Sequence, residues 1–270
     1  MTDPAIRDDS ALLSVADLHV EFDTHGGIVK AVRGVSFDLY AGKTLAIVGE
    51  SGCGKSVSVH SIMGLIPMPP GRITQGSATL GGVDILGKKT IDGEDIRGSK
   101  VGMIFQDPMT SLNPTMTIGD QIAETLQVHR GFSHAQAFAR AIELINMVRI
   151  PDASQRAQQY PFQFSGGMLQ RSMIAMAIAC GPSLLIADEP TTALDVTIQA
   201  QILDMMGDLQ RDSGMAIILI THDLGVVARM ADDVVVMYAG EIIEKGTVDD
   251  VFYRSSHPYT LGLKEAMPSN

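Results

Sequence analysis

Alternating apolar and polar residues mark two segments near the start of the chain. They alternate along 35–40, which is typical of a strand with one buried face, and a strand is predicted over 31–40. A similar strand is predicted over 12–22, and Gly26-Gly27 forms a turn between the two. We therefore predict an antiparallel pair here, and a second hairpin over 77–86 with Gly81-Gly82 as its turn.

Four other short segments are apolar without alternation, as expected of strands that are buried on both faces. A helical pattern, with apolar residues three or four apart between 198 and 209, lies between the last two segments and closes at Gly214. A strand, a helix and a second buried strand in this order predict a β-α-β unit with a parallel sheet. The four segments are 45–48, 101–105, 184–187 and 216–220.

The middle of the chain has a helical character. Thr117 and Ser133 resemble helix starts because Asp or Gln follows three residues later, and apolar residues between 138 and 148 recur at spacings of four and three. We predict a mostly helical insertion over about 108–168. A last hairpin is predicted around 238–240, followed by a helical tail from about Asp249 onward.

The chain is predicted to form one domain over 12–270 after a flexible N-terminus, 1–11. Its 270 residues are 45% hydrophobic and 19% charged, which is ordinary for a soluble globular protein. The first residues are polar and acidic, unlike a signal peptide, and no apolar stretch reaches the length of a membrane span. Any membrane role is therefore expected to depend on a partner.

Charge and cysteine content narrow the possible functions. With 20 basic and 31 acidic residues the net charge is −11, which repels a phosphate backbone and argues against nonspecific nucleic-acid binding. The two cysteines, Cys53 and Cys180, lie far apart in the sequence and suggest neither a disulfide framework nor a metal cluster. A reducing compartment is expected.

A phosphate-binding loop is predicted directly after the apolar segment 45–48. Its glycines allow a tight turn in which successive N–H groups point at phosphate oxygens, and the following helix adds its positive N-terminal end. Lys55 would reach the β- and γ-phosphates and the Ser56 hydroxyl would hold Mg²⁺. The alternative is a Gly-rich turn that binds nothing. The loop residues are Gly49, Glu50, Ser51, Gly52, Cys53, Gly54, Lys55 and Ser56.

The same loop leads to an expectation about the two thiols. The N–H groups of the loop and the helix N-terminus favour a thiolate at Cys53. We therefore expect that thiol to be modifiable when the loop is empty, whereas Cys180, in an apolar run, is expected to be buried and inert.

Two acidic residues end the apolar segment 184–187. Ligands bind at the carboxyl ends of the strands in α/β sheets, so Asp188 would belong to the Mg²⁺ shell and Glu189 would accept a proton from, or orient, an attacking water. A solvated strand end is the alternative interpretation, and this stretch taken alone favours that alternative.

Several further motifs resemble those of ATP-binding-cassette (ABC) ATPases. Phe164-Ser165-Gly166-Gly167-Met168 is similar to the signature motif of that family, with Met168 where Gln is usual, a departure typical of the peptide-permease branch. Gln106 is similar to the Q-loop, Thr192-Ala193-Leu194-Asp195 to the D-loop, and His222 to the switch histidine. The motifs occur in family order, and the resemblance covers about residues 12 to 267.

This resemblance implies a fold and a set of roles. The fold would be α/β: a P-loop NTPase ABC cassette with a RecA-like parallel-sheet core, an antiparallel β subdomain and a helical insertion. Phe22 would stack on adenine, although an edge-strand Phe is more often a core residue. Gln106 would approach Mg²⁺ and the water, and His222 would bind the γ-phosphate. Ser165, Gly166 and Gly167 would form an anion site for the γ-phosphate bound to a second, head-to-tail cassette.

Three stretches narrow the resemblance to the oligopeptide and dipeptide permease ATPases: 105–114, 164–171 and His257-Pro258-Tyr259-Thr260. The implied function is ATP hydrolysis in a bacterial peptide importer. Its partners would be a second ABC ATPase subunit, two transmembrane permease subunits and, indirectly, an extracytoplasmic substrate-binding protein, with no nucleic acid. The chain would lie at the cytoplasmic face of the bacterial inner membrane.

Three alternatives remain at this stage. Nickel and glutathione importers are near relatives of the peptide permeases. A soluble cassette ATPase that acts on nucleic acid or ribosomes usually carries tandem cassettes, long coiled-coil insertions or basic surfaces, whereas this chain has one cassette, no heptad run and a net charge of −11. A small-molecule P-loop kinase would lack the signature motif.

Overall fold

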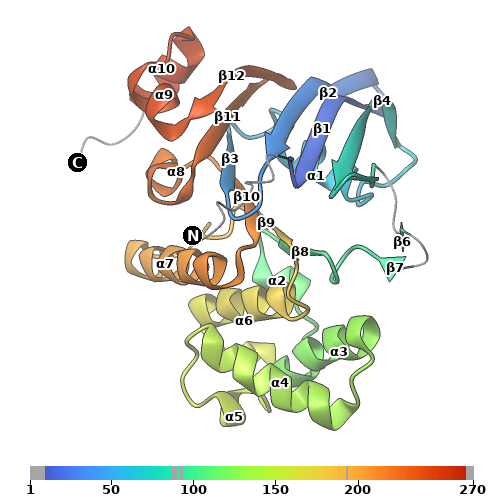
Figure 1. The fold of residues 1–270 in the computed structure, drawn as a ribbon, viewed down its shortest axis with the longest axis vertical. Helices are drawn as coiled ribbons and strands as arrows, with labels where there is room; N and C mark the ends of the chain where they lie inside the picture. Colours follow the sequence, from blue (N-terminus) through green and yellow to red (C-terminus); the bar gives the residue numbers. More distant parts are fainter. Residues whose placement is uncertain (1–9, 87–89, 92–93, 193, 266–270) are drawn as a thin grey trace, which may run out of the picture.

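The computed structural model describes residues 10–86, 90–91, 94–192 and 194–265. Of the N-terminal segment expected to be flexible, 1–11, only residues 10 and 11 are among these residues. Figure 1 shows the sheets in one half of the molecule and a group of helices in the other.

A six-stranded sheet forms the centre, in the order β12-β11-β3-β10-β9-β8. The pairs β8/β9, β9/β10, β10/β3 and β3/β11 are parallel, and β11/β12 is antiparallel. The parallel β-α-β unit predicted from the apolar segments is therefore confirmed. The strands are β3 (Thr44–Val48), β8 (Val101–Ile104), β9 (Leu184–Asp188), β10 (Ala216–Thr221), β11 (Asp233–Tyr238) and β12 (Glu241–Thr247).

The two inner strands β9 and β10 bury every residue. Alternate side chains enter two different hydrophobic cores: Leu185 and Ile217 face the core built with the helices, whereas Ile186 and Ile218 face the core shared with the second sheet. Burial on both faces explains why these segments are apolar without alternation.

The second sheet is antiparallel, in the order β2-β1-β4-β5. Both predicted hairpins are confirmed, but β4 begins earlier than the predicted residue 77. Its first half carries polar, mostly exposed residues such as Arg72 and Gln75, which hide the strand pattern in the sequence. The strands are β1 (Leu13–Thr24), β2 (Gly27–Leu39), β4 (Gly71–Leu80) and β5 (Val83–Asp84), and a separate pair is formed by β6 (Thr90–Ile91) and β7 (Glu94–Asp95).

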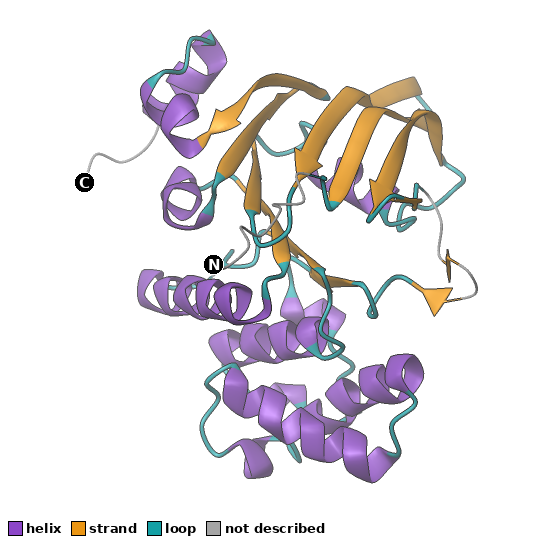
Figure 2. Cartoon of the chain, viewed as in Figure 1, coloured by secondary structure: helices purple, strands orange, loops and turns teal. Residues whose placement is uncertain are grey.

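One group of helices lies below the central sheet in the view of Figure 2, and the last three helices of the chain lie at its upper left. The two predicted helix starts are confirmed, because the Thr117 and Ser133 hydroxyls accept hydrogen bonds from the N–H groups of Asp120 and Gln136. The helices are α1 (Lys55–Ile62), α2 (Pro108–Ser111), α3 (Ile118–Arg130), α4 (His134–Met147), α5 (Ala153–Arg156), the 3-10 turn η1 (Pro161–Gln163), α6 (Gly166–Ile178), α7 (Val196–Ser213), α8 (Leu224–Met230), α9 (Val248–Tyr253) and α10 (Pro258–Glu265).

Within the described residues, no helix combines the length and the apolar character that crossing a bilayer requires.

Close packing between the sheet and α6 gives a stability prediction. A Cβ on Gly102 in β8 would overlap with the carbonyl oxygen of Ala177 in α6. Gly102→Ala is therefore expected to lower the free energy of unfolding by about 1–3 kcal/mol, because the strand and the helix must move apart. Chemical denaturation measures this change.

The matched control is Gly262→Ala. Gly262 lies in α10, and a Cβ there would meet nothing within 4 Å. This control is expected to leave the stability unchanged or to raise it by up to about 1 kcal/mol, because Ala is the better helix former. Equal stability of Gly102→Ala and the wild type would contradict the close contact.

Candidate nucleotide-binding site

The predicted phosphate loop joins β3 to α1, and its glycines are required by the backbones around it. Gly49 and Gly54 have φ angles of 151° and 104°. A Cβ on Gly49 would overlap with the carbonyl oxygen of Met237 in β11, and a Cβ on Gly54 with that of Ala31 in β2. Only glycine fits both the conformation and the space, so the two sheets together hold the loop in its tight turn.

Lys55 lies at the centre of this loop. Its side chain is buried, and Nζ donates hydrogen bonds to the carbonyl oxygens of Gly49 at 2.7 Å and Glu50 at 2.9 Å. A buried ammonium group needs such partners, since its desolvation is otherwise costly. The loop therefore presents a fixed positive charge where the sequence predicted phosphate contacts.

Two predicted metal ligands are brought together beside the loop. The Ser56 hydroxyl donates to Oδ1 of the buried Asp188 at 2.9 Å, and His60 Nε2 lies 3.3 Å from Oδ2. Ser56 and His60 are four residues apart on α1, so they lie on the same face of the helix. The Ser56 hydroxyl thus holds one oxygen of the carboxylate by a hydrogen bond, and the His60 ring lies beside the other.

The chemistry of this pair fits Mg²⁺. Carboxylate and hydroxyl oxygens are hard donors, and Mg²⁺ in phosphate-transferring sites takes one or two protein ligands together with substrate phosphates and waters. In the described part of the chain, no group of three or more His, Cys, Asp or Glu residues could hold a metal alone. Ser56 and Asp188 suit an ion that arrives with a nucleotide.

Glu189 is the centre of a second cluster. Its Oε2 accepts hydrogen bonds from Gln106 Nε2 at 3.1 Å and Thr192 Oγ1 at 2.9 Å. Its Oε1 lies 3.2 Å from His222 Nδ1. Glu189 has a φ angle of 48°, a left-handed conformation that is strained for a residue other than glycine and is common at functional sites.

The topology of the sheet explains this meeting. Gln106 follows β8, Asp188 ends β9 with Glu189 directly after it, and His222 follows β10. These three strands are parallel neighbours. Because parallel strands end at the same edge, residues more than a hundred positions apart converge there. Gln106, Glu189 and His222, which were predicted separately, are therefore in direct contact.

The signature residues lie elsewhere. Ser165 caps the start of α6, and its hydroxyl accepts from the Met168 N–H at 3.4 Å. A Cβ on Gly167 would lie 2.8 Å from Ile198, so this turn packs on the beginning of α7. Ser165 and Gly166 are exposed, and among the described residues no hydrogen bond or ion pair joins them to 49–56. Figure 1 shows α6 with the lower helices and α1 among the upper strands.

Phe22, the predicted adenine platform, is partly buried against the core of the antiparallel sheet. Its ring lies beside Gly71, close to Ile66, and both residues follow the C-terminal end of α1. The strand of this sheet that touches the loop is β2, through Ala31. Phe22 thus has a packing position at the edge of this core, and its stacking on adenine stays a prediction.

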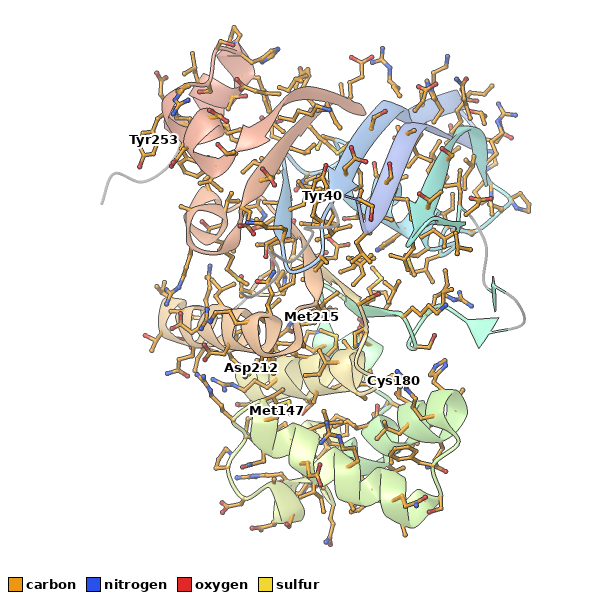
Figure 3. All side chains as sticks on the ribbon, viewed as in Figure 1. Tyr40, Met147, Cys180, Asp212, Met215 and Tyr253 are labelled. Atoms are coloured by element: carbon orange, nitrogen blue, oxygen red, sulfur yellow. The ribbon has the colours of Figure 1, made fainter. Side chains whose placement is uncertain are left out.

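The expectation of an accessible thiol at Cys53 is wrong. Its side chain is only 6% exposed and packs in the core below the loop, with its Sγ next to Gly49. The tight turn directs this side chain into the core. Cys180 is buried as expected, just beyond the end of α6 (Figure 3), and burial raises the pKa of its thiol.

Three contacts were missed by sequence reasoning. Thr192 was assigned to a motif without a role, although its position three residues after Glu189 was a signal. His60 could have been found from its spacing to Ser56. The third contact, from the Glu50 N–H to the Tyr259 hydroxyl at 3.0 Å, joins residues 209 apart and has no local signal. Ala193, in the predicted D-loop, lies outside the described residues.

Solved structures share this architecture. A dimeric post-hydrolysis state of an ATP-binding cassette bound to ADP and Pi superposes with a TM-score of 0.76 at 26% sequence identity, over 87% of this chain and 98% of that chain. The expected α/β cassette fold, with a parallel-sheet core, an antiparallel sheet and helices, is therefore confirmed.

Sequence comparisons agree. A family model described as ABC transporter matches residues 32–192. The oligopeptide transport ATP-binding protein OppD of Bacillus subtilis (strain 168) is 58% identical over 258 residues, which are 96% of this chain and 72% of that protein. The dipeptide transport ATP-binding protein DppD of the same strain is 56% identical over 257 residues, 95% of this chain and 77% of that protein. With such identity along almost its whole length, the chain belongs to the ABC transporter family.

Proposed function

We propose that this chain is the ATP-binding and ATP-hydrolysing subunit of a bacterial ABC importer for oligopeptides or dipeptides. The observation that carries the proposal is the convergence of Gln106, Glu189 and His222 beside the Ser56–Asp188 pair and the phosphate loop. The names of the two relatives, which are oligopeptide and dipeptide transport ATP-binding proteins, support the peptide substrate.

Nucleotide binding would use the loop and Lys55. The N–H groups of the loop, with the first turn of α1, form an anion site, and Lys55 would exchange its carbonyl partners for the β- and γ-phosphate oxygens. Ser56, Asp188 and Gln106 would hold Mg²⁺. When bound, this ion would neutralise charge on the β- and γ-phosphates.

Hydrolysis would depend on Glu189. Its carboxylate is held by Thr192 and Gln106, so one oxygen edge has a fixed direction, and it would orient the attacking water or accept a proton from it. His222, which lies 3.2 Å away and is largely exposed, would turn to the γ-phosphate. Positioning and charge stabilisation account for most of the catalysis of phosphoryl transfer.

One chain would supply only half of each ATP site. The turn Ser165–Gly167, in which Ser165 and Gly166 are exposed, lies at the start of α6, away from the loop of its own chain. Its N–H groups would bind the γ-phosphate held by a second cassette, head to tail, and the dimeric relative supports this arrangement. Two transmembrane permease subunits and an extracytoplasmic substrate-binding protein would complete the transporter, with this chain at the cytoplasmic face of the inner membrane.

The peptide assignment predicts an uptake defect. Cells that lack this chain are expected to lose ATP-dependent uptake of labelled dipeptides or oligopeptides, since the permeases would have no ATPase, and expression of the chain is expected to restore uptake. Uptake of labelled nickel and glutathione is measured in the same cells. Loss of nickel or glutathione uptake with normal peptide uptake would contradict the assignment.

Glu189→Gln is expected to bind ATP normally and to lower turnover by about a hundredfold or more, because an amide does not accept the proton. Lys55→Ala is the contrasting variant: it removes a charged contact with phosphate and is expected to weaken ATP binding by about 1.5–3 kcal/mol. Steady-state hydrolysis and equilibrium binding of ATP separate the two effects. Near-normal turnover of Glu189→Gln would show that Glu189 is not the base.

Dimerisation is expected to depend on ATP and on Ser165. Glu189→Gln with MgATP is expected to shift from monomer to dimer in light scattering, whereas MgADP or no nucleotide leaves the monomer. Adding Ser165→Arg is expected to abolish the shift, because a bulky side chain would occupy the γ-phosphate position. A dimer that ignores nucleotide or Ser165→Arg would rule out the head-to-tail arrangement.

A further inference from the structure

The C-terminal helices pack against the strand that enters the phosphate loop. Val251 in α9 shares a hydrophobic core with Ala46 and Val48 of β3, and Tyr259 and Leu263 in α10 pack against the same core. Val48 immediately precedes Gly49. Figure 1 shows α9 and α10 together beside β11 and β12, at the same end of the molecule as the antiparallel sheet.

Tyr259 connects these helices directly to the loop. Its hydroxyl oxygen accepts a hydrogen bond from the backbone N–H of Glu50 at 3.0 Å. Its ring lies against Tyr238 with a centroid distance of 4.7 Å and a tilt of 51°, an arrangement that fixes both rings. Burial raises the pKa of Tyr259, so the hydroxyl is uncharged at neutral pH.

The peptide groups on both sides of Glu50 are thereby restrained. The Glu50 N–H donates to the Tyr259 hydroxyl. The Glu50 carbonyl oxygen accepts hydrogen bonds from Lys55 Nζ at 2.9 Å and from the Cys53 N–H at 3.3 Å. The same carbonyl is a partner that Lys55 would leave when it contacts phosphate. Tyr259 therefore holds the segment against which Lys55 is packed.

The residues around Tyr259 are organised to place it. Its own N–H donates to His257 Nδ1 at 3.1 Å, and Glu244 in β12 accepts from the Ser256 N–H at 3.0 Å. Although burial raises the pKa of Glu244, hydrogen bonds from the backbone, including the one from the Ser256 N–H, outweigh this effect and lower the pKa. The His257–Thr260 motif thus forms a rigid start for α10, with the tyrosine directed at the loop.

We propose that Tyr259 is a positioning residue for the phosphate-binding loop. Through this residue, the helices α9 and α10 set the affinity of the loop for nucleotide. The hydroxyl keeps the first turn of the loop in place before nucleotide arrives, so less conformational entropy is lost on binding. The hydroxyl contacts only the backbone of Glu50, the second residue of the loop. It is not assigned to the reacting atoms. This inference rests on the proposed binding of ATP to the loop.

Tyr259→Phe tests the inference, because it keeps the ring and removes only the acceptor. MgATP binding to the purified chain by calorimetry is expected to weaken about 2–10-fold, the effect of one hydrogen bond. The KM for ATP is expected to rise by the same factor with kcat unchanged. In the nucleotide-free chain, amide hydrogen exchange at 49–54 is expected to be faster than in the wild type.

The control is Tyr253→Phe. Tyr253 lies in the same pair of helices, is 82% exposed and sits at the outer edge of the molecule (Figure 3), so this variant is expected to match the wild type in every measurement. Failure of the wild type itself to bind MgATP would refute the proposed function. If the wild type binds MgATP and Tyr259→Phe matches it in affinity and in amide exchange of the loop, only the role of Tyr259 is refuted. A lower kcat of Tyr259→Phe at an unchanged KM for ATP would also refute that role.

Discussion

The central sheet of this protein has inner strands that are buried on both faces, and this constraint determines the rest of the structure. Side chains of β9 and β10 alternate between two cores, so each face needs its own cover. The helices α3, α4, α6 and α7 cover one face, and the antiparallel sheet with α1 covers the other. Polar groups are thus excluded from the strands and collect at the strand ends. The site lies at this edge because no other part of these strands can hold charged residues.

At this edge, each charged group of the site has a partner within the chain. Lys55 binds two loop carbonyl groups, Asp188 accepts a hydrogen bond from Ser56, and Glu189 is held by Gln106 and Thr192. Buried charges without such partners would cost several kcal/mol each. The partners also fix the direction of each group, so little reorganisation is needed when a phosphate approaches. The same hydrogen bonds therefore stabilise the fold and preorganise the site.

Features that depend on residues close together in the sequence could be predicted. Features that depend on contacts with distant parts of the chain could not. Buried strands, helix caps such as Thr117 and Ser133, and the glycine turn follow from nearby residues. The start of β4 was missed because exposed polar residues mask it. The prediction for Cys53 failed because the direction of its side chain depends on Met237 and Ala31, which press on the loop from other strands. Motifs identified the separate parts of the site, while only the sheet order shows that these parts touch.

The loop shows how local and distant causes combine. Its N–H groups must remain directed at an anion, yet a buried N–H without a partner is costly. The Glu50 N–H donates to the Tyr259 hydroxyl, so this N–H is not free for phosphate. The groups left for an anion lie among the residues after Glu50, apart from the Cys53 N–H, which donates to the Glu50 carbonyl oxygen, and they are closer to the positive end of α1. A contact from the far end of the chain thus helps to decide which part of a short motif faces the ligand, which the motif itself cannot specify.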